Sequence, residues 1–189
     1  MILKYLIITL ILLRVILLGF SQEDPYMIPW SKDVRLKFED FHEDPDSASK
    51  FDALSMIGPW IKPSANSAKR LEIRTYFAKY GSWMKPNVRI KELLEHENVH
   101  FDIAELFTRK IIMKYDSLLR LNIEDHVVIN LINNRIVHSI NFECADLNAQ
   151  FDFETKHGQY YGLTVEWLEK IHKELKKYEE YSYENYYAR

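Results

Sequence analysis

Apolar positions in the second half of the chain recur with the period of a helix. From Asn87 onward the repeat falls at spacings of three, four and seven residues. The positions on this stripe are Leu93, His96, His100, Ile103, Phe107 and Ile111. The pattern predicts a helix of roughly 25 residues that begins near Asn87 and buries this stripe.

Two further helices are predicted after it. Asn122 is a suitable N-cap for the second helix. The buried face of that helix is expected at Val128, Leu131, Ile132, Ile136, Ile140 and Phe142. Thr164 is expected to cap the third helix, with Leu163 and Leu168 placed for a hydrophobic staple. The Tyr-rich, charged tail, residues 176–189, is expected to be a solvated helix end.

The first half of the chain has a different pattern. Polar and apolar residues alternate over 35–41 and over 71–77, which predicts two half-buried strands. Residues 43–46 and 62–67 have the composition of turns and loops. The expected fold class is therefore α+β, with a small N-terminal sheet packed on a helical half.

Length and composition narrow the class of protein. The chain has 189 residues, 47% of them hydrophobic, and a formal net charge of −3. That length suits one domain, expected over 22–189. The mild acidity argues against a nucleic-acid partner. Since Cys144 is the one cysteine, a disulfide framework and a Cys-rich zinc site are excluded.

The N-terminus has the layout of a secretory signal peptide. Lys4 precedes an apolar run over 5–20, and small residues at Gly19 and Ser21 mark a cleavage site before Gln22. We therefore expect a signal peptide over 1–21 and an exported protein, periplasmic or secreted, without a membrane span after cleavage. An uncleaved N-terminal anchor is the alternative.

The candidate chemistry lies in the first predicted helix, in the pattern H-E-x-x-H. His96 and His100 are four residues apart, so a helix places both imidazoles on one side, where they can bind one ion. Glu97 is one step round from His96 and can act as a general base toward a water without binding the metal itself. The pattern predicts a zinc site.

A catalytic zinc site needs a third protein ligand. His157 is the first candidate, because it stands before Gly158 at the expected break between the second and third helices. Asp152 and Glu154 remain alternatives, and Asp152 could instead support a ligand histidine. The other histidines need only ordinary surface or core roles: His42, His126, His138 and His172.

Other polar side chains near the motif have weaker claims. Glu105 falls on the opposite side of the helix from His96, so Glu105 and Asp102 are expected to orient loops or to face water. Tyr160 or Tyr161 could donate to an oxyanion, although simple packing also explains them.

Several segments together resemble a known family. They are Ile28-Pro-Trp30, Asp40-Phe41, Ser82-Trp83, the run H-E-N-V-H-F-D-I-A-E over 96–105, and D-F-E-T-K-H-G over 152–158. In this order they are similar to the bacterial family described as predicted secreted zinc-dependent proteases. The resemblance implies a zincin-type domain in which His96, His100 and His157 bind zinc and Glu97 is the catalytic base.

The function expected from the sequence is an exported zinc metallopeptidase that acts on a peptide or protein substrate. A non-catalytic, zinc-containing binding domain of the cell envelope is the alternative. An exported interaction domain without metal is a third possibility.

Overall fold

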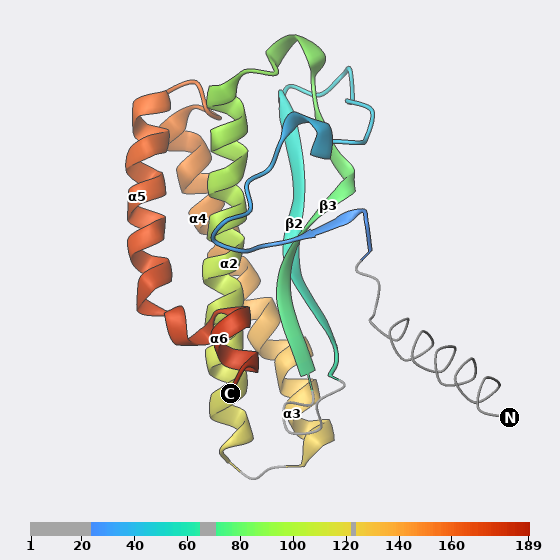
Figure 1. Cartoon of the computed structure of the whole chain (residues 1–189), viewed down its shortest axis with the longest axis vertical. Helices are drawn as coiled ribbons and strands as arrows, with labels where there is room; N and C mark the ends of the chain where they lie inside the picture. Colours follow the sequence, from blue (N-terminus) through green and yellow to red (C-terminus); the bar gives the residue numbers. More distant parts are fainter. Residues whose placement is uncertain (1–23, 65–70, 122–123) are drawn as a thin grey trace, which may run out of the picture.

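The computed structural model describes residues 24–64, 71–121 and 124–189 (Figure 1). Within this part the fold is mixed α+β, with a small antiparallel sheet against a layer of helices. The expected signal peptide lies outside the described residues. None of the described helices combines the length and the apolar character that crossing a bilayer requires.

Three antiparallel strands form the sheet. They are β1 (Met27–Pro29), β2 (Ala53–Pro63) and β3 (Leu71–Met84), in the order β1-β3-β2, so β2 is an edge strand. The strand predicted over 71–77 is confirmed as the first half of β3. Its inner face is buried where the alternation placed it: Leu71, Ile73, Thr75 and Phe77.

The alternation does not predict β2, because Gly58, Pro59 and Pro63 interrupt it. An edge strand tolerates proline, since the missing N–H can lie on the side without a neighbouring strand. β2 continues to Pro63, so the start of the loop predicted over 62–67 is wrong, and residues 65–70 lie outside the described part.

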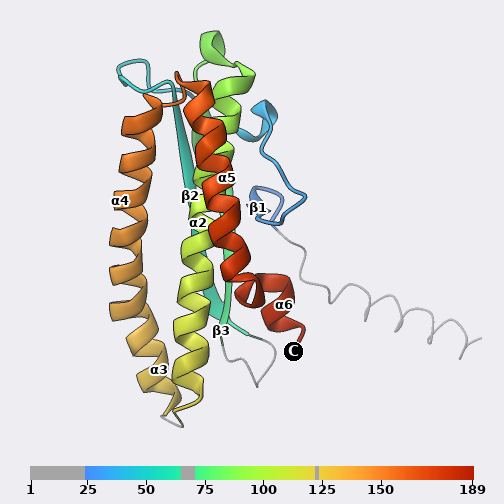
Figure 2. The same cartoon turned by 90° about the vertical axis from the view of Figure 1, so that its left-hand side faces the viewer.

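The helices are α2 (Lys91–Leu119), α3 (Asp125–Leu131), α4 (Val137–Thr155), α5 (Tyr161–Lys177) and α6 (Tyr183–Tyr187), and a π-helical stretch over Ile132–Ile136 joins α3 to α4. α2 lies between the sheet on one side and α4 and α5 on the other (Figures 1 and 2). Because of this central position, α2 contacts both the sheet and the other helices.

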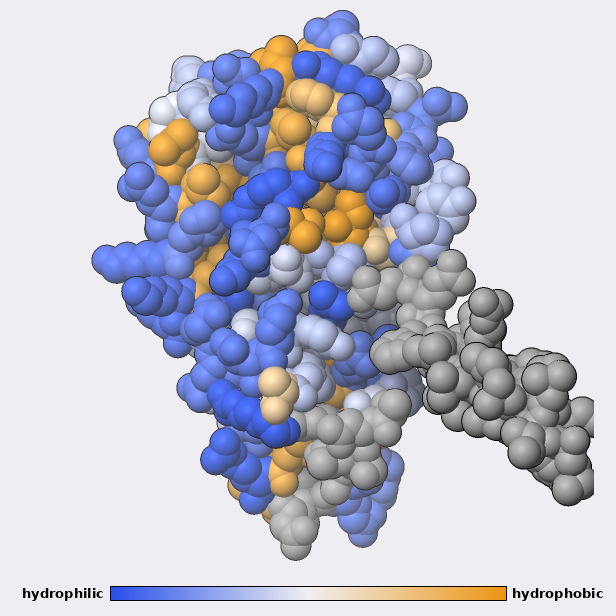
Figure 3. All heavy atoms as spheres, viewed as in Figure 1, coloured by the Kyte–Doolittle hydropathy of each residue, from blue (hydrophilic) through white to orange (hydrophobic). Residues whose placement is uncertain are grey.

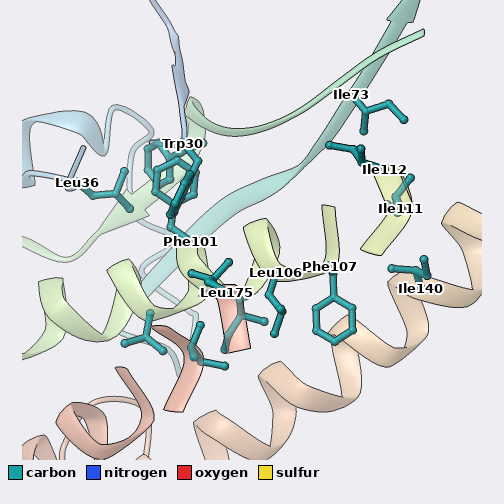
Figure 4. Packing of buried hydrophobic residues seen from close by; sticks show 14 of the residues in the cluster. Trp30, Leu36, Ile73, Phe101, Leu106, Phe107, Ile111, Ile112, Ile140 and Leu175 are labelled. Carbon is teal, nitrogen blue, oxygen red and sulfur yellow. The ribbon is translucent and has the colours of Figure 1, made fainter. Parts of the chain in front are cut away.

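α2 begins at Lys91, four residues after the expected start, because Pro86–Val88 form a short 3-10 turn. The predicted stripe of α2 is buried except for His100, which is partly exposed. Side chains of α2 meet those of the sheet, α4 and α5 in one core (Figure 4).

On the face drawn in Figure 3, hydrophobic residues show in separate patches between hydrophilic ones, mainly in the upper half.

The strand predicted over 35–41 is wrong. Its centre is a 3-10 turn over Phe38–Asp40, and the backbone N–H of Lys37 donates to the side chain of Asp40. The N–H of Leu36 donates to the side chain of Asn98 on α2 instead of to a neighbouring strand. The alternation instead reflects Leu36 and Phe41, which turn separately into the core.

Three details of the second and third helices also differ. Phe142 is 62% exposed, since it follows the buried Ile140 by two positions and so points away from the core. Asn122 lies outside the described residues, and α3 begins after Glu124. The third helix begins at Tyr161, so Thr164 is inside its first turn and the predicted staple is wrong.

The predicted solvated tail is wrong as well. After α5 the chain folds back through α6, and Tyr186 is fully buried. The hydroxyl of Tyr187 donates to the carbonyl of Leu71 and accepts from the N–H of Ile73. The C-terminus therefore holds the first residues of β3 in place.

Candidate metal centre

His96 and His100 lie one turn apart on α2 and face α4. Their Nε2 atoms are 3.1 Å apart, and the two rings are perpendicular. Phe151 of α4 is fully buried and stacks on the ring of His96 at 4.4 Å. The convergence that the four-residue spacing predicted is thus present.

Asp152 of α4 completes a triangle of possible ligand atoms. Its Oδ1 lies 3.0 Å from Nε2 of His96 and 3.1 Å from Nε2 of His100. These three atoms can hold a metal ion. A point exists within about 2.1 Å of all three, which is the length of a zinc bond to imidazole or carboxylate.

Neighbouring side chains determine which nitrogen of each histidine carries its proton. Asn148 donates its amide to the carbonyl of Cys144, so its oxygen accepts from Nδ1 of His100 at 2.7 Å. Thr155 donates its hydroxyl to the carbonyl of Phe151, which leaves its oxygen to accept from Nδ1 of His96 at 3.4 Å. Each neutral imidazole therefore presents an unprotonated Nε2 to the triangle.

The two Nε2 atoms and Oδ1 therefore direct three lone pairs at one another from about 3 Å. Their mutual repulsion is relieved by a cation between them. Without a metal the cation is a proton, and the pKa directions reflect this. Burial lowers the pKa of His96. Burial also acts to lower the pKa of His100, but the contact with Asp152, the charge of Glu97 and the hydrogen bond to Asn148 together outweigh it and raise that pKa. Burial acts to raise the pKa of the Asp152 carboxyl, but the contacts with His100 and His96 together outweigh it and lower that pKa.

Glu97 is buried beside this triangle and is held by the sheet. The hydroxyl of Ser55 on β2 donates to Oε2 of Glu97 at 2.5 Å. The extra residues of the irregular pairing between Leu54 and Met56 belong to β3, so β2 itself keeps its alternation. Ser55 stands between the exposed Leu54 and Met56 and therefore points to the opposite face, toward α2.

His157 lies at the rim of the cluster. Its Nδ1 is 3.5 Å from Oδ1 of Asp152, and its side chain is 55% exposed and touches Phe51 edge-on. The turn that carries it is left-handed at Lys156, His157 and Gly158. The geometry favours Asp152 over His157 as the third ligand and leaves His157 within reach of Asp152.

Glu154 turns away from the cluster, because two positions along a helix correspond to about 200°. It accepts from Gln150 and from the indole of Trp167. The hydroxyl of Tyr161 donates to Glu95, and Tyr160 is exposed.

The other histidines lie away from the triangle. His42, His126 and His138 are exposed, as expected. His172 is paired with the buried Asp102 at 3.0 Å, so its side chain is not simply solvated.

Asp102 and Glu105 were expected to orient loops or to face water; both are buried on the other side of α2, so neither faces water, and Asp102 does orient a loop. Asp102 accepts from the indole of Trp30 and from Arg35, which orients the N-terminal segment. Glu105 accepts from Thr75 on β3 and from the buried Arg109. These contacts fix α2 in the fold without taking part in the site.

A cavity of about 560 Å³ opens beside the cluster, between β2, α2 and α4. Its lining includes Ser55, Glu97, Asp152 and both motif histidines. A volume of this size is typical of small-molecule or peptide-side-chain sites.

Comparisons with known proteins give no relative: no family model, no curated protein and no solved structure matches the chain.

Proposed function

We propose that the chain is a zinc-dependent hydrolase of peptide bonds. The observation that carries this proposal is the triangle of His96 Nε2, His100 Nε2 and Asp152 Oδ1 beside the buried Glu97. Two neutral imidazoles and one carboxylate form a known set of ligands for catalytic zinc. Three protein ligands leave one position for water or substrate, whereas structural zinc sites normally have four.

Bound zinc would supply an electrophile that polarises a carbonyl and makes a water more acidic. The chain supplies the base. Ser55 donates to one oxygen of Glu97, which leaves the other oxygen to accept the proton of the attacking water. Glu97 can then return that proton to the leaving amine. Asn148 and Thr155 hold the two imidazoles in the tautomer that binds metal.

The edge position of β2 supports a peptide as the substrate. β2 is hydrogen-bonded to β3 along one side, and its residues Ile57, Gly58 and Pro59 line the cavity. An extended peptide can add to such an edge through main-chain hydrogen bonds, except at Pro59, which has no N–H to donate. A peptide bound there would pass beside Glu97.

The test is digestion of a defined peptide pool by zinc-loaded protein, read by mass spectrometry for new termini. Glu97→Gln should bind zinc as the wild type does and should form no new termini, because the amide cannot accept the proton. Glu95→Gln is the matched control, since Glu95 lies on the same helix and accepts from Tyr161 instead of facing the cluster.

The alternative of a non-catalytic zinc domain predicts a different result. Zinc would bind, but wild type, Glu97→Gln and Glu95→Gln would all leave the pool intact. Cleavage by Glu97→Gln at the wild-type rate would reject the assignment of Glu97 as the base.

A further inference from the structure

The cavity beside the cluster has two chemically different ends. At one end lie the carboxylates of Asp52, Glu97 and Asp152 and the imidazoles. The other end continues along α2 from His100 to Ile111, a distance of about 16 Å. Among the described residues that line this far end there is no Asp, Glu, Lys, Arg or His. They are Ala104, Phe107, Thr108 and Ile111 of α2 and Asn141, Cys144 and Ala145 of α4.

The floor of the far end is apolar and rigid. Phe107 and Ile111 are almost fully buried in the core and present only a small part of their surface to the cavity. Cys144 adds a neutral wall, because burial raises the pKa of its thiol to about 11. Lys110 lies near Cys144 but is outside the lining and is paired with Glu143. An ammonium or carboxylate placed here would lose water and would find no charged side chain in the lining.

The open space at this end comes from small side chains. Ala104 on α2 and Ala145 on α4 line it from opposite helices, and neither side chain extends beyond Cβ. Gly58 on β2 also lines the cavity, and a Cβ built on it has no atom within 4 Å. A branched or aromatic side chain of a bound molecule can therefore enter between the three elements.

We propose that this end is a specificity pocket that selects a large apolar side chain of the substrate, of the Leu, Met or Phe type, next to the reacting peptide bond. This proposal depends on the proposed function, since the cluster defines where the reacting bond lies. An apolar residue bound there removes its own surface from water, together with the small part of Phe107 that faces the cavity. A lysine at the same place is expected to bind at least ten-fold less well, because its charge is desolvated.

The test measures binding instead of turnover. The probes are Nα-acetyl-leucine hydroxamate and Nα-acetyl-lysine hydroxamate, which share a metal-binding group and differ in the side chain. Calorimetric titration of zinc-loaded protein should give at least ten-fold tighter binding of the leucine probe. Ala145→Leu should remove most of this preference by filling the pocket. Ala149→Leu, at an exposed position of α4 outside the cavity lining, should keep it.

The outcomes separate the two proposals. Binding of neither probe above the level of metal-free protein would reject the metal site, and the pocket with it. Equal binding of both probes would overturn the pocket alone and leave the hydrolase proposal standing. A preference that Ala145→Leu leaves unchanged would also overturn the pocket, because the side chain would then bind elsewhere.

Discussion

The backbone of Gly158 lies directly against the side chain of His96. A Cβ built on Gly158 would come 3.1 Å from Cβ and 3.2 Å from Cγ of His96. Gly158 also has a φ of +84°, which residues with a side chain rarely adopt. The backbone of the turn after α4 can therefore pack this closely against His96 only because residue 158 is glycine.

Gly158→Ala should damage both stability and the metal site. We expect a loss of more than about 1 kcal/mol in the free energy of unfolding, because alanine is strained at this φ. Zinc affinity should fall as well, since the added Cβ lies 3.1 Å from His96 and displaces that ligand from its present position. Gly162→Ala is the control: Gly162 is helical, and its Cβ would meet nothing within 4 Å. Denaturant unfolding and zinc titration of both variants check the prediction.

Asp152→Asn should weaken zinc binding more than any other change on α4. Removing the anionic member of the triangle should exceed the 10–100-fold loss typical of supporting residues. His157→Ala should fall within that smaller range, and Glu154→Gln, which faces Trp167, should have no effect. Competition titration with a chromogenic chelator measures all three. The opposite order for Asp152 and His157 would make His157 the third ligand.

Ser55→Ala should slow hydrolysis without changing the affinity for zinc. Ser55 contacts Glu97 and none of the three ligand atoms, so only the orientation of the base is disturbed. We expect a fall in kcat of about ten-fold or more, with little change in KM. Ser117→Ala removes an exposed side-chain hydrogen bond at the far end of α2 and is the control. A loss of zinc in Ser55→Ala would contradict a role limited to Glu97.

The convergence of the two motif histidines could be predicted from the sequence because it depends on one helix. The spacing of His96 and His100 and the apolar stripe around them both follow from a period of 3.6 residues. The ligand from α4 was harder to assign. The sequence places residues 151–158 at a break between helices, whereas α4 continues to Thr155. That extra turn adds Asp152 and Thr155 to the side of α4 where Asn148 already contacts α2.

Residues that join distant segments could not be predicted in this way. Ser55 reaches Glu97 from β2, a strand whose proline and glycine residues hide it from a search for alternating polar and apolar positions. The tail was predicted wrongly for a related reason. Its charges and tyrosines suggest solvent exposure, but the hydroxyl of Tyr187 bonds to the backbone of β3, more than 100 residues earlier.

Tyr187→Phe should destabilise the fold, although it removes a single oxygen atom. The buried N–H of Ile73 and the carbonyl of Leu71 would each lose a partner. Leaving a buried polar group unsatisfied costs about 1–3 kcal/mol. Tyr160→Phe, at an exposed position, should change the free energy of unfolding by less than about 0.5 kcal/mol. Urea unfolding of both variants, followed by tryptophan fluorescence, compares them.

Glu105 should make stability depend on pH. Burial raises the pKa of Glu105 from 4.5 to about 7, despite the opposing effects of Arg109 and Thr75. Between these two values the native state binds more protons than the unfolded state. The contribution of Glu105 to stability therefore falls as the pH rises from about 4.5 to 7 and is level above that range.

Glu105→Gln should remove this dependence, because glutamine does not titrate. Its amide can still accept from Arg109 and pair with the hydroxyl of Thr75, so the fold should persist. Urea unfolding at intervals from pH 5 to pH 8 should show a smaller fall in stability for Glu105→Gln than for the wild type. Glu92→Gln, exposed in the first turn of α2, should follow the wild-type curve. Parallel curves for all three proteins would mean that Glu105 stays ionised through its pairing with Arg109.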